Sequence, residues 1–295
     1  KNYGVFAREE VYPQLAKYQM KFCQSPALIN QLVSEADGIF FNGGDQSLTL
    51  ASLASVKDEK KNFSSTYELI SRRHSEGELV VAGTSAGAAV QSGGILQGKK
   101  IPMVTNGESE YGFVNGSVAT IRPPSSQCVF ENSCDKSVEL KTLTRFDSGG
   151  FEMMQIGIFD THFSERDRLF RLIRLMEDSG IIVGTGVDEN TALEMSSLGG
   201  EVVLRGHGEG ATWIVQSHSQ SPNKFKLHML WKNESASVKT DSNGPEGELR
   251  LSDKALKRTQ KLIKRLSTRD DKVSQLLSRA FKNGNKNSTE SIDIQ

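Results

Sequence analysis

The stretch Glu78-Leu-Val-Val-Ala82 runs directly into Gly83-Thr84-Ser85-Ala86-Gly87, and this junction decides the fold that we expect. The apolar run has the length and composition of a buried strand, and the small residues after the glycines favour a helix. Glycines on both sides of Ser85 permit a sharp turn where a Cβ atom would meet nearby backbone. Gly-x-Ser-x-Gly between a strand and a helix is the nucleophile-elbow pattern, so Ser85 is the expected nucleophile, with the Ala86 amide as an oxyanion donor.

The same order of strand, glycine turn and helix occurs once before. Gly38-Ile-Phe-Phe41 is a short apolar run that ends in Asn42-Gly43-Gly44, and helical patterns follow at 46–54 and 64–75. Repeated units of this kind predict an α/β fold with a doubly wound, mostly parallel sheet and helices on both faces.

Other segments are expected to surround this core. We expect helices over 8–35, an insertion of hairpins and loops over about 99–150, a strand at 154–159, a helix at about 164–177, a strand at 181–183 and antiparallel edge strands over 191–240. A basic amphipathic helix is expected over about 252–282, followed by a disordered tail. We therefore expect an α/β domain over 1–250 and a helical extension over 251–295.

Composition excludes several classes of protein. The 295 residues carry 36 lysines and arginines against 36 aspartates and glutamates, so the net charge argues against a general nucleic-acid binder. No apolar run is long enough for a membrane span. Neither the cysteines nor the histidines have metal-ligand spacing, so we expect no metal and no cofactor.

Three features bear on the compartment. The sequence opens at Lys1 without a methionine, the insertion is polar, and Cys128 and Cys134 lie close together in a loop, where they are either bridged or free. A bridge would require an oxidising environment, so these features favour export (periplasmic or extracellular) over the cytoplasm. Cys23 falls in an apolar helical pattern and is expected to be a buried thiol.

A serine nucleophile needs a base, and His162 is the best-placed histidine. It follows the apolar run 156–159 directly, at the carboxyl end of an expected strand, where open parallel sheets place their sites. An acid to orient its ring is expected from Asp188 or Glu189, which follow another apolar strand. Arg166, Arg168 and Arg171 are expected to open the next helix with Ser164 as N-cap, and cations there would favour an anionic partner.

These blocks together resemble the cyanophycinase branch of the aspartyl-dipeptidase-like serine peptidases. The resemblance rests on four motifs in the order of that family, spanning roughly residues 36–195: Gly43-Gly44-Asp45-Gln46, Gly83-Thr84-Ser85-Ala86-Gly87-Ala88, Asp160-x-His162-Phe163 with Arg166-x-Arg168-x-x-Arg171, and Gly186-Val187-Asp188-Glu189-x-Thr191-Ala192. The family has a flavodoxin-like fold akin to class I glutamine amidotransferases, with serine in place of their cysteine. Thr161 and Phe170 stand where it usually has glutamine and glycine, and its N-terminal strands have no counterpart in this sequence.

The resemblance implies a role for each matching residue. Ser85, His162 and Glu189 would form the triad, and the amides of Gly44 and Ala86 would form the oxyanion hole. The substrate pocket would be lined by Gln46, Asp160, Thr161, Arg166, Arg168 and Arg171. The implied activity is exopeptidase cleavage of cyanophycin, a polymer of aspartate and arginine, to β-aspartyl-arginine dipeptides. A peptide substrate is thus the expected partner, and a homodimer is an assembly that the sequence permits.

Two other readings of the residues remain open. A general α/β-hydrolase esterase would use a base after the acid in the chain, which would be His207, His218 or His228. A member of the resembled family with another aspartyl-peptide substrate, or without catalysis, would retain the fold but not this reaction.

Overall fold

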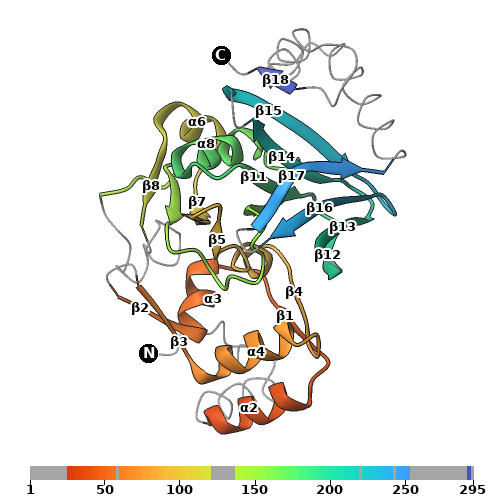
Figure 1. Ribbon diagram of the computed structural model, residues 1–295. Helices are drawn as coiled ribbons and strands as arrows, with labels where there is room; N and C mark the ends of the chain where they lie inside the picture. The colour runs from red at the N-terminus through yellow and green to blue at the C-terminus, as the bar shows by residue number, and fades with distance from the viewer. Residues whose placement is uncertain are drawn as a thin grey trace.

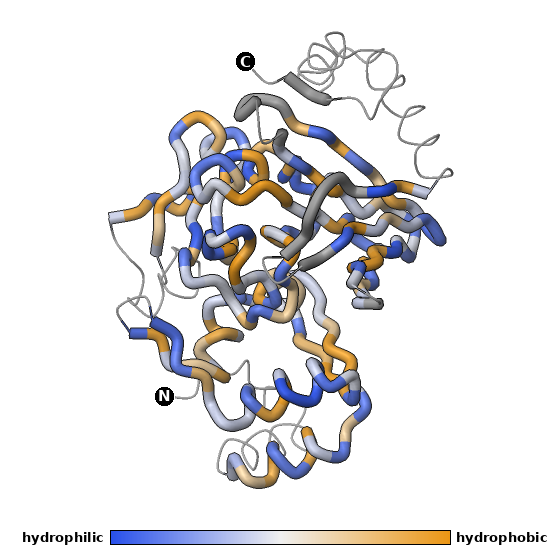
Figure 2. The backbone as a smooth tube through the Cα atoms, viewed as in Figure 1, coloured by the Kyte–Doolittle hydropathy of each residue, from blue (hydrophilic) through white to orange (hydrophobic). Residues whose placement is uncertain are grey.

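The computed structural model describes residues 25–57, 60–120, 137–198, 200–218, 221–241, 244–252 and 291–293. At one end of the molecule, helices α2 (Pro26–Glu35) and α4 (Ser65–Ser75) pack beside strands β1 (Gly38–Phe41) and β4 (Val80–Gly83) (Figure 1). Val33, Ile70 and Leu79 form the buried cluster between them. Apolar and polar residues alternate along both helices, as expected where only one face is buried (Figure 2).

The nucleophile motif lies where this end meets the rest of the protein. Strand β4 pairs in parallel with β1, and the short helix α5 (Ala86–Ala89) follows its end. Helix α3 (Gln46–Leu53) follows β1 and is capped by Asp45, whose carboxylate accepts a hydrogen bond from the Ser47 amide at 2.8 Å. A hairpin of β2 (Ala54–Lys57) and β3 (Lys60–Phe63) then leads to α4.

The segment over about 99–150 contains its own small sheet. Strands β7 (Met103–Asn106), β9 (Leu143–Phe146) and β8 (Ser117–Ala119) lie side by side in that order, with helix α6 (Ser109–Asn115) between β7 and β8 in the chain. The hairpin of β5 (Ile95–Leu96) and β6 (Lys99–Lys100) precedes them. Hairpins and loops were expected over this segment, but its described part is a mixed sheet with a helix, since β9 pairs antiparallel with β7 and parallel with β8.

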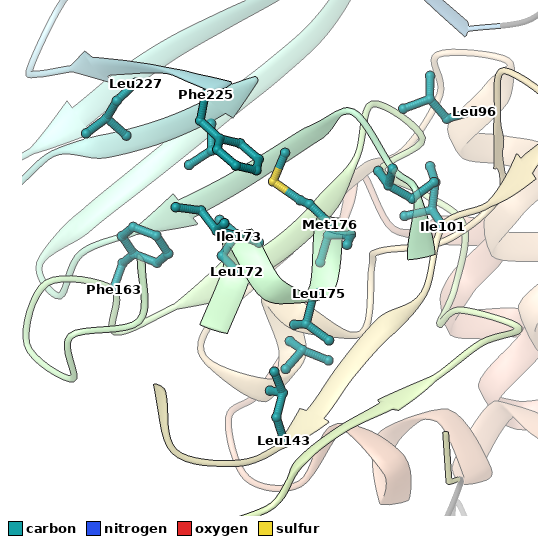
Figure 3. Packing of buried hydrophobic residues seen from close by; sticks show 14 residues of the cluster. Leu96, Ile101, Leu143, Phe163, Leu172, Ile173, Leu175, Met176, Phe225 and Leu227 are labelled. Carbon is teal, nitrogen blue, oxygen red and sulfur yellow. The ribbon is translucent and has the colours of Figure 1, made fainter. Parts of the chain in front are cut away.

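A five-stranded mixed sheet contains the strands that precede His162 and Glu189. Its order is β10 (Ile158–Thr161), β11 (Val183–Val187), β14 (Thr212–His218), β15 (Ser221–Leu230) and β18 (Ser291–Asp293). Helix α8 (Leu169–Ser179) packs against it through buried residues that include Leu172 and Met176, which meet Phe225 from β15 (Figure 3). Strands β10 and β11 are parallel, so their carboxyl ends lie at the same edge.

A second sheet faces the first. Strands β12 (Thr191–Leu198), β13 (Glu201–Gly208), β16 (Ser235–Asp241) and β17 (Gly244–Leu251) are all antiparallel. Leu204 and Val238 from this sheet share a buried cluster with Ile214 and Leu230 from the other. Apolar side chains on facing strands therefore form the core at this end.

The predicted doubly wound parallel sheet is wrong. Several small antiparallel and mixed sheets are present instead, and among the described strands no hydrogen-bonded ladder joins β4 to β10. The long strands of residues 191–251 pair antiparallel with their sequence neighbours, because short loops can join only antiparallel strands. Phe40 and Val80 are 60% and 68% exposed, whereas a doubly wound sheet would cover both faces of β1 and β4.

Several element boundaries also differ from expectation. The strand expected at 154–159 begins only at Ile158, and the helix expected from 164 begins at Leu169. The tail expected to be disordered contributes Ser291–Asp293 to the five-stranded sheet. Residues 8–24, the helix expected over about 252–282, and all three cysteines lie outside the described residues. In the described part, no helix is both long and apolar enough to cross a membrane.

Candidate active site

Ser85 occupies a sharp turn between β4 and α5. Its backbone has φ 51° and ψ −117°, a conformation that a residue with a side chain rarely adopts. The turn is closed by hydrogen bonds from the Thr84 amide to the Phe41 carbonyl at 3.0 Å and from the Gly87 amide to the Thr84 carbonyl at 2.8 Å. Such strain persists only where the surrounding structure enforces it, and it is common at nucleophiles.

The two flanking glycines are required by close backbone contacts. A Cβ atom at Gly83 would lie 2.1 Å from the Gly87 carbonyl oxygen, and one at Gly87 would lie 2.0 Å from the carbonyl oxygen of Phe41. No side chain fits at either distance, so the glycines allow α5 to approach the ends of β1 and β4.

Ser85, His162 and Glu189 are joined in one chain of hydrogen bonds. The Ser85 Oγ lies 2.7 Å from Nε2 of His162, and Nδ1 of His162 lies 2.7 Å from Oε1 of Glu189. The histidine side chain is 22% exposed and that of Glu189 is 50% exposed. An imidazole held between a hydroxyl and a carboxylate is the arrangement of a serine–histidine–acid triad.

The parallel pairing of β10 and β11 explains why base and acid meet. His162 is the first residue after β10, and Glu189 is the second after β11, while the ladder ends at the pair Thr161 and Val187. The backbone turns sharply just after each strand, since His162 has φ 48° and Asn190 has φ 53°. The two side chains are thereby directed toward Ser85 from neighbouring strand ends.

The strand pattern left the acid open between Asp188 and Glu189, and the resemblance implied Glu189; the structure places Glu189 against the histidine. Asp188 is 8% exposed, and its carboxylate accepts hydrogen bonds from the Ser164 amide at 3.0 Å and the Trp213 indole at 2.9 Å. It also accepts one from the Ala211 amide at 3.0 Å. Asp188 therefore holds the loop, and Glu189 contacts the base.

The amides of Gly44 and Ala86 line the same cavity as Ser85. Ala86 is the first residue of α5, so its amide has no partner within the helix. Gly44 has φ 139° in the loop before α3. Within the described residues neither amide donates to a protein group, which leaves both available for an oxygen bound beside Ser85.

A cavity of about 520 Å³ with three arginines opens beside Ser85. The charged residues that line it are Asp45, Asp160, Arg166, Arg168 and Arg171. Three cations against two carboxylates leave one net positive charge around the cavity. A ligand with a carboxylate therefore complements it.

Asp160 accepts hydrogen bonds from two of these arginines, Arg168 and Arg171. Its side chain is fully buried, and Arg171 donates to it from Nε at 2.7 Å and from Nη2 at 2.6 Å, a two-pronged contact. Arg168 adds a bond from Nη1 at 3.2 Å. Burial alone would raise the pKa of Asp160, but the charges of Arg171 and Arg168 outweigh it and hold the pKa below its ordinary value.

This geometry changes the role expected of Asp160. Both of its oxygens are engaged by arginines, so it is not placed to receive the guanidinium of a substrate. Burial, together with the charges of Arg171 and Arg166, lowers the pKa of Arg168 to about 10, and Asp160 opposes that shift. Arg168 thus remains a cation near neutral pH.

The arginines do not open the helix as expected. Ser164 is not the N-cap, because Asp167 has φ 49°, which a helix cannot accommodate, and α8 begins at Leu169. Arg168 occupies the N-cap position, and Arg171 lies in the first turn of α8. Arg166 is exposed before the helix and, among the described contacts, makes no side-chain hydrogen bond or ion pair.

The insertion supplies contacts that sequence reasoning missed. The Gln46 side-chain amide donates to the carbonyls of Val104 and Thr105, each at 2.8 Å, and Arg171 Nη1 donates to the Gly107 carbonyl at 2.7 Å. These acceptors are backbone groups, so no side-chain pattern in the sequence could have indicated them. The aromatic residue at 170 is explained here too, since its ring lies 5.2 Å from that of Phe113 in α6.

A second cavity, of about 490 Å³, opens on another side of Ser85. Its walls are mostly apolar and include Met153, Phe159 and Met195, whereas His162 and Thr161 border it near the triad. Thr161 lines both cavities, is 7% exposed and donates its amide to Asp160 at 2.8 Å. The nucleophile therefore stands between a cationic space and an apolar one.

Two of the three alternative bases of an esterase, His207 and His228, make no described contact with Ser85. His207 lies in β13 and contacts Glu194 through Nε2 at 2.7 Å, and His228 is buried in β15. His218 ends β14, and its side chain lies outside the part of the chain that the structure describes. Of the described histidines, His162 alone is hydrogen-bonded to the nucleophile.

The chemistry of the site follows from its own residues. No cluster of three or more metal-ligating side chains occurs in the described parts of the chain. No known family model matches this sequence.

The arrangement combines a nucleophile, a base, an acid, two free amides and a cationic cavity, and these are the components of acyl transfer from a substrate that carries a carboxylate.

Proposed function

We propose that this protein is a serine peptidase that cleaves acidic peptides through a Ser85–His162–Glu189 triad. The observation that carries the proposal is the continuous pair of 2.7 Å hydrogen bonds that links these three side chains on a strained elbow. A strained serine in contact with an oriented histidine is costly to maintain, and acyl transfer is the chemistry that uses it.

In the first step, Ser85 attacks the carbonyl carbon of the substrate while His162 Nε2 takes the hydroxyl proton. Glu189 orients the imidazole through Nδ1 and stabilises the cation that forms. The amides of Gly44 and Ala86 donate to the oxygen of the tetrahedral intermediate. His162 then gives its proton to the departing amine, and the acyl group remains as an ester on Ser85.

In the second step, water attacks this ester, and His162 takes a proton from that water. The bond between Oγ and the acyl carbon breaks, the acid product leaves, and the proton returns to Ser85 from the histidine. No metal or cofactor takes part in this scheme.

The arginine cavity supports selection of a carboxylate close to the cleaved bond. Arg166 is the exposed cation, and Arg168 is partly exposed at 14% of its side chain, so both are available to a ligand. Arg171 donates hydrogen bonds to Asp160 and to the Gly107 carbonyl, and it forms the floor of the arginine cavity. Planar guanidinium groups bind carboxylates through paired hydrogen bonds, which gives selectivity by geometry as well as by charge.

Within acidic peptides, we propose cyanophycin as the substrate and β-aspartyl-arginine as the product. Each unit of that polymer offers a free carboxylate and a guanidinium. Arg166 and Arg168 would bind the carboxylate, and Oδ2 of Asp45 would receive the guanidinium, because both oxygens of Asp160 are engaged whereas Asp45 caps α3 through Oδ1. The support for this choice is the resemblance of the four motifs together with the charges around the cavity.

The test is to incubate the protein with cyanophycin, with β-aspartyl dipeptides and with a neutral amide analogue, and to identify products by mass. A serine-directed phosphonate in parallel reports whether Ser85 is reactive, and Ser85→Ala is the control. Release of β-aspartyl-arginine supports the full proposal. Cleavage of aspartyl dipeptides alone would keep the mechanism but change the substrate, and a phosphonate-inert Ser85 would refute the peptidase.

A further inference from the structure

Two carboxylates connect the loop of the base to the loop of the acid. Oδ1 of Asp188, beside the acid, accepts a hydrogen bond from the Ser164 amide in the base loop at 3.0 Å. In return, Oε1 of Glu165 in the base loop accepts one from the Glu189 amide at 3.0 Å. Each loop thus supplies one carboxylate to a backbone amide of the other.

These contacts lie just beyond the end of the β10–β11 ladder. The last pair in the ladder is Thr161 with Val187, and one further backbone bond joins the Phe163 amide to the Val187 carbonyl at 3.2 Å. Beyond this bond, the two loops are joined by the hydrogen bonds that the carboxylates of Asp188 and Glu165 accept. The triad residues lie within this short stretch, where backbone pairing no longer sets their separation.

Asp188 is itself held from a third direction. Its Oδ1 accepts from the Trp213 indole and its Oδ2 from the Ala211 amide, both at the start of the β14 region. Space around it is tight, because a Cβ atom at Gly210 would lie 2.7 Å from the Cβ of Asp188. The carboxylate cannot change rotamer without losing several donors, so it is a rigid anchor.

We propose that Asp188 and Glu165 are positioning residues that set the contact between His162 and Glu189. His162 and Asn190 have positive φ angles, which residues with side chains hold only under restraint from their surroundings. Asp188 and Glu165 supply that restraint on both loops. The inference rests on the proposed function, because the contact matters for rate only if Ser85 is a nucleophile.

Four variants test this assignment. Asp188→Asn keeps the size of the side chain but puts an NH₂ group where an oxygen accepted a hydrogen bond. Glu165→Ala removes the other acceptor, whereas Glu165→Gln keeps a carbonyl oxygen and should rescue. Asp178→Asn is the matched control, because Asp178 also accepts from a backbone amide, that of Ser117 at 2.7 Å, and takes no part in the triad.

Two measurements separate positioning from general stability. The first is the NMR resonance of the His162 Nδ1 proton shared with Glu189, and the second is the rate constant for labelling of Ser85 by a phosphonate. We expect Asp188→Asn to lower this rate by about 100-fold, as a displacement of about 1 Å in a catalytic group does, and Glu165→Ala by about tenfold. Both should weaken or shift the resonance, whereas Glu165→Gln and Asp178→Asn should leave both readouts close to wild type.

The outcomes are distinguishable from failure of the proposed function. If wild-type Ser85 does not react with the phosphonate, the peptidase proposal fails, and the resonance alone still decides whether Asp188 and Glu165 hold the histidine. An unchanged resonance and rate in Glu165→Ala would overturn the inference, and this exposed position allows that test even if Asp188→Asn does not fold. An equal loss in Asp178→Asn would also overturn it, because the effect would then be general.

Discussion

Replacing Asp160 by asparagine tests the buried cluster beneath the arginine cavity. Asp160 has no exposed surface and is bound by Arg171 at 2.6 and 2.7 Å and by Arg168 at 3.2 Å. Asparagine has nearly the same shape but no charge, and its NH₂ group would face guanidinium N–H donors. Two cations would remain in a space where 5% and 14% of their side chains are exposed.

Removal of one partner from a buried ion pair costs about 3–5 kcal/mol, because the remaining charge stays buried without compensation. Two such charges remain here, so we expect Asp160→Asn to lower the free energy of unfolding by about 4 kcal/mol. The whole free energy of unfolding of a domain is only about 5–15 kcal/mol. The variant should therefore be close to the limit of stable folding, and the arginines should lose their fixed positions.

The effect also has a predicted dependence on pH. The folded-state pKa of Asp160 lies below its ordinary value of 3.8 because the charges of Arg171 and Arg168 outweigh burial. A depressed carboxylate pKa contributes stability that is present above about pH 4 and is lost as the pH falls through the folded value. Wild type should lose this contribution below about pH 4, and Asp160→Asn should show a smaller loss across the same range.

The assay is urea unfolding followed by the fluorescence of Trp213 and Trp231, the two tryptophans of the chain. Arg171→Met and the double variant with Asp160→Asn complete a cycle, and we expect the double variant to lose less stability than the sum of the single variants. Asp178→Asn, which breaks a more exposed pair with Arg174, should cost only about 1 kcal/mol. If Asp160→Asn cost no more than this control, the cluster would not stabilise the fold as argued.

Three further predictions concern the site. Ser85→Ala and His162→Ala should each lower turnover by about 10⁴-fold or more while the melting temperature stays near wild type, and a tenth of the activity left in either variant would contradict the mechanism. Gly87→Ala should disrupt the elbow, because the new Cβ would lie 2.0 Å from the Phe41 carbonyl oxygen, and equal stability by thermal unfolding would contradict that packing. Arg166→Gln should raise KM about tenfold for peptides with a free carboxylate but not for neutral amides, with stability unchanged; an equal rise for both substrates would remove carboxylate binding from its role.

Short-range features of this protein were predictable from local pattern. The strand Gly38–Phe41, the helix Gln46–Leu53 and the helix Ser65–Ser75 lie where the apolar run and the helical patterns indicated them. The turn at Ser85 was predictable for the same reason, because only glycine fits on either side of it. The helix contacts join residues close together in the chain, whereas the turn at Ser85 also depends on the distant Phe41 carbonyl, which a Cβ atom at Gly87 would meet at 2.0 Å.

Strand partners were not predictable in the same way. An apolar run indicates a strand but not its neighbour, and the expected parallel sheet would have brought the apolar runs together in one sheet. The described strands instead form separate sheets, with β11 antiparallel to β14. The start of α8 was predicted too early, because Asp167 has φ 49° and the helix begins only at Leu169.

The sequence by itself determined which chemical groups are present and which turns hold them: a serine on an elbow, a histidine after a strand, and arginines in the segment that follows. Only the tertiary structure decided how they are used. It placed Glu189 rather than Asp188 against His162, it directed Asp160 inward to Arg171, and it brought the carbonyls of the insertion to Gln46. The physical reason is that a hydrogen bond depends on positions in space within about 3 Å, and the spacing of residues along a chain does not specify those positions.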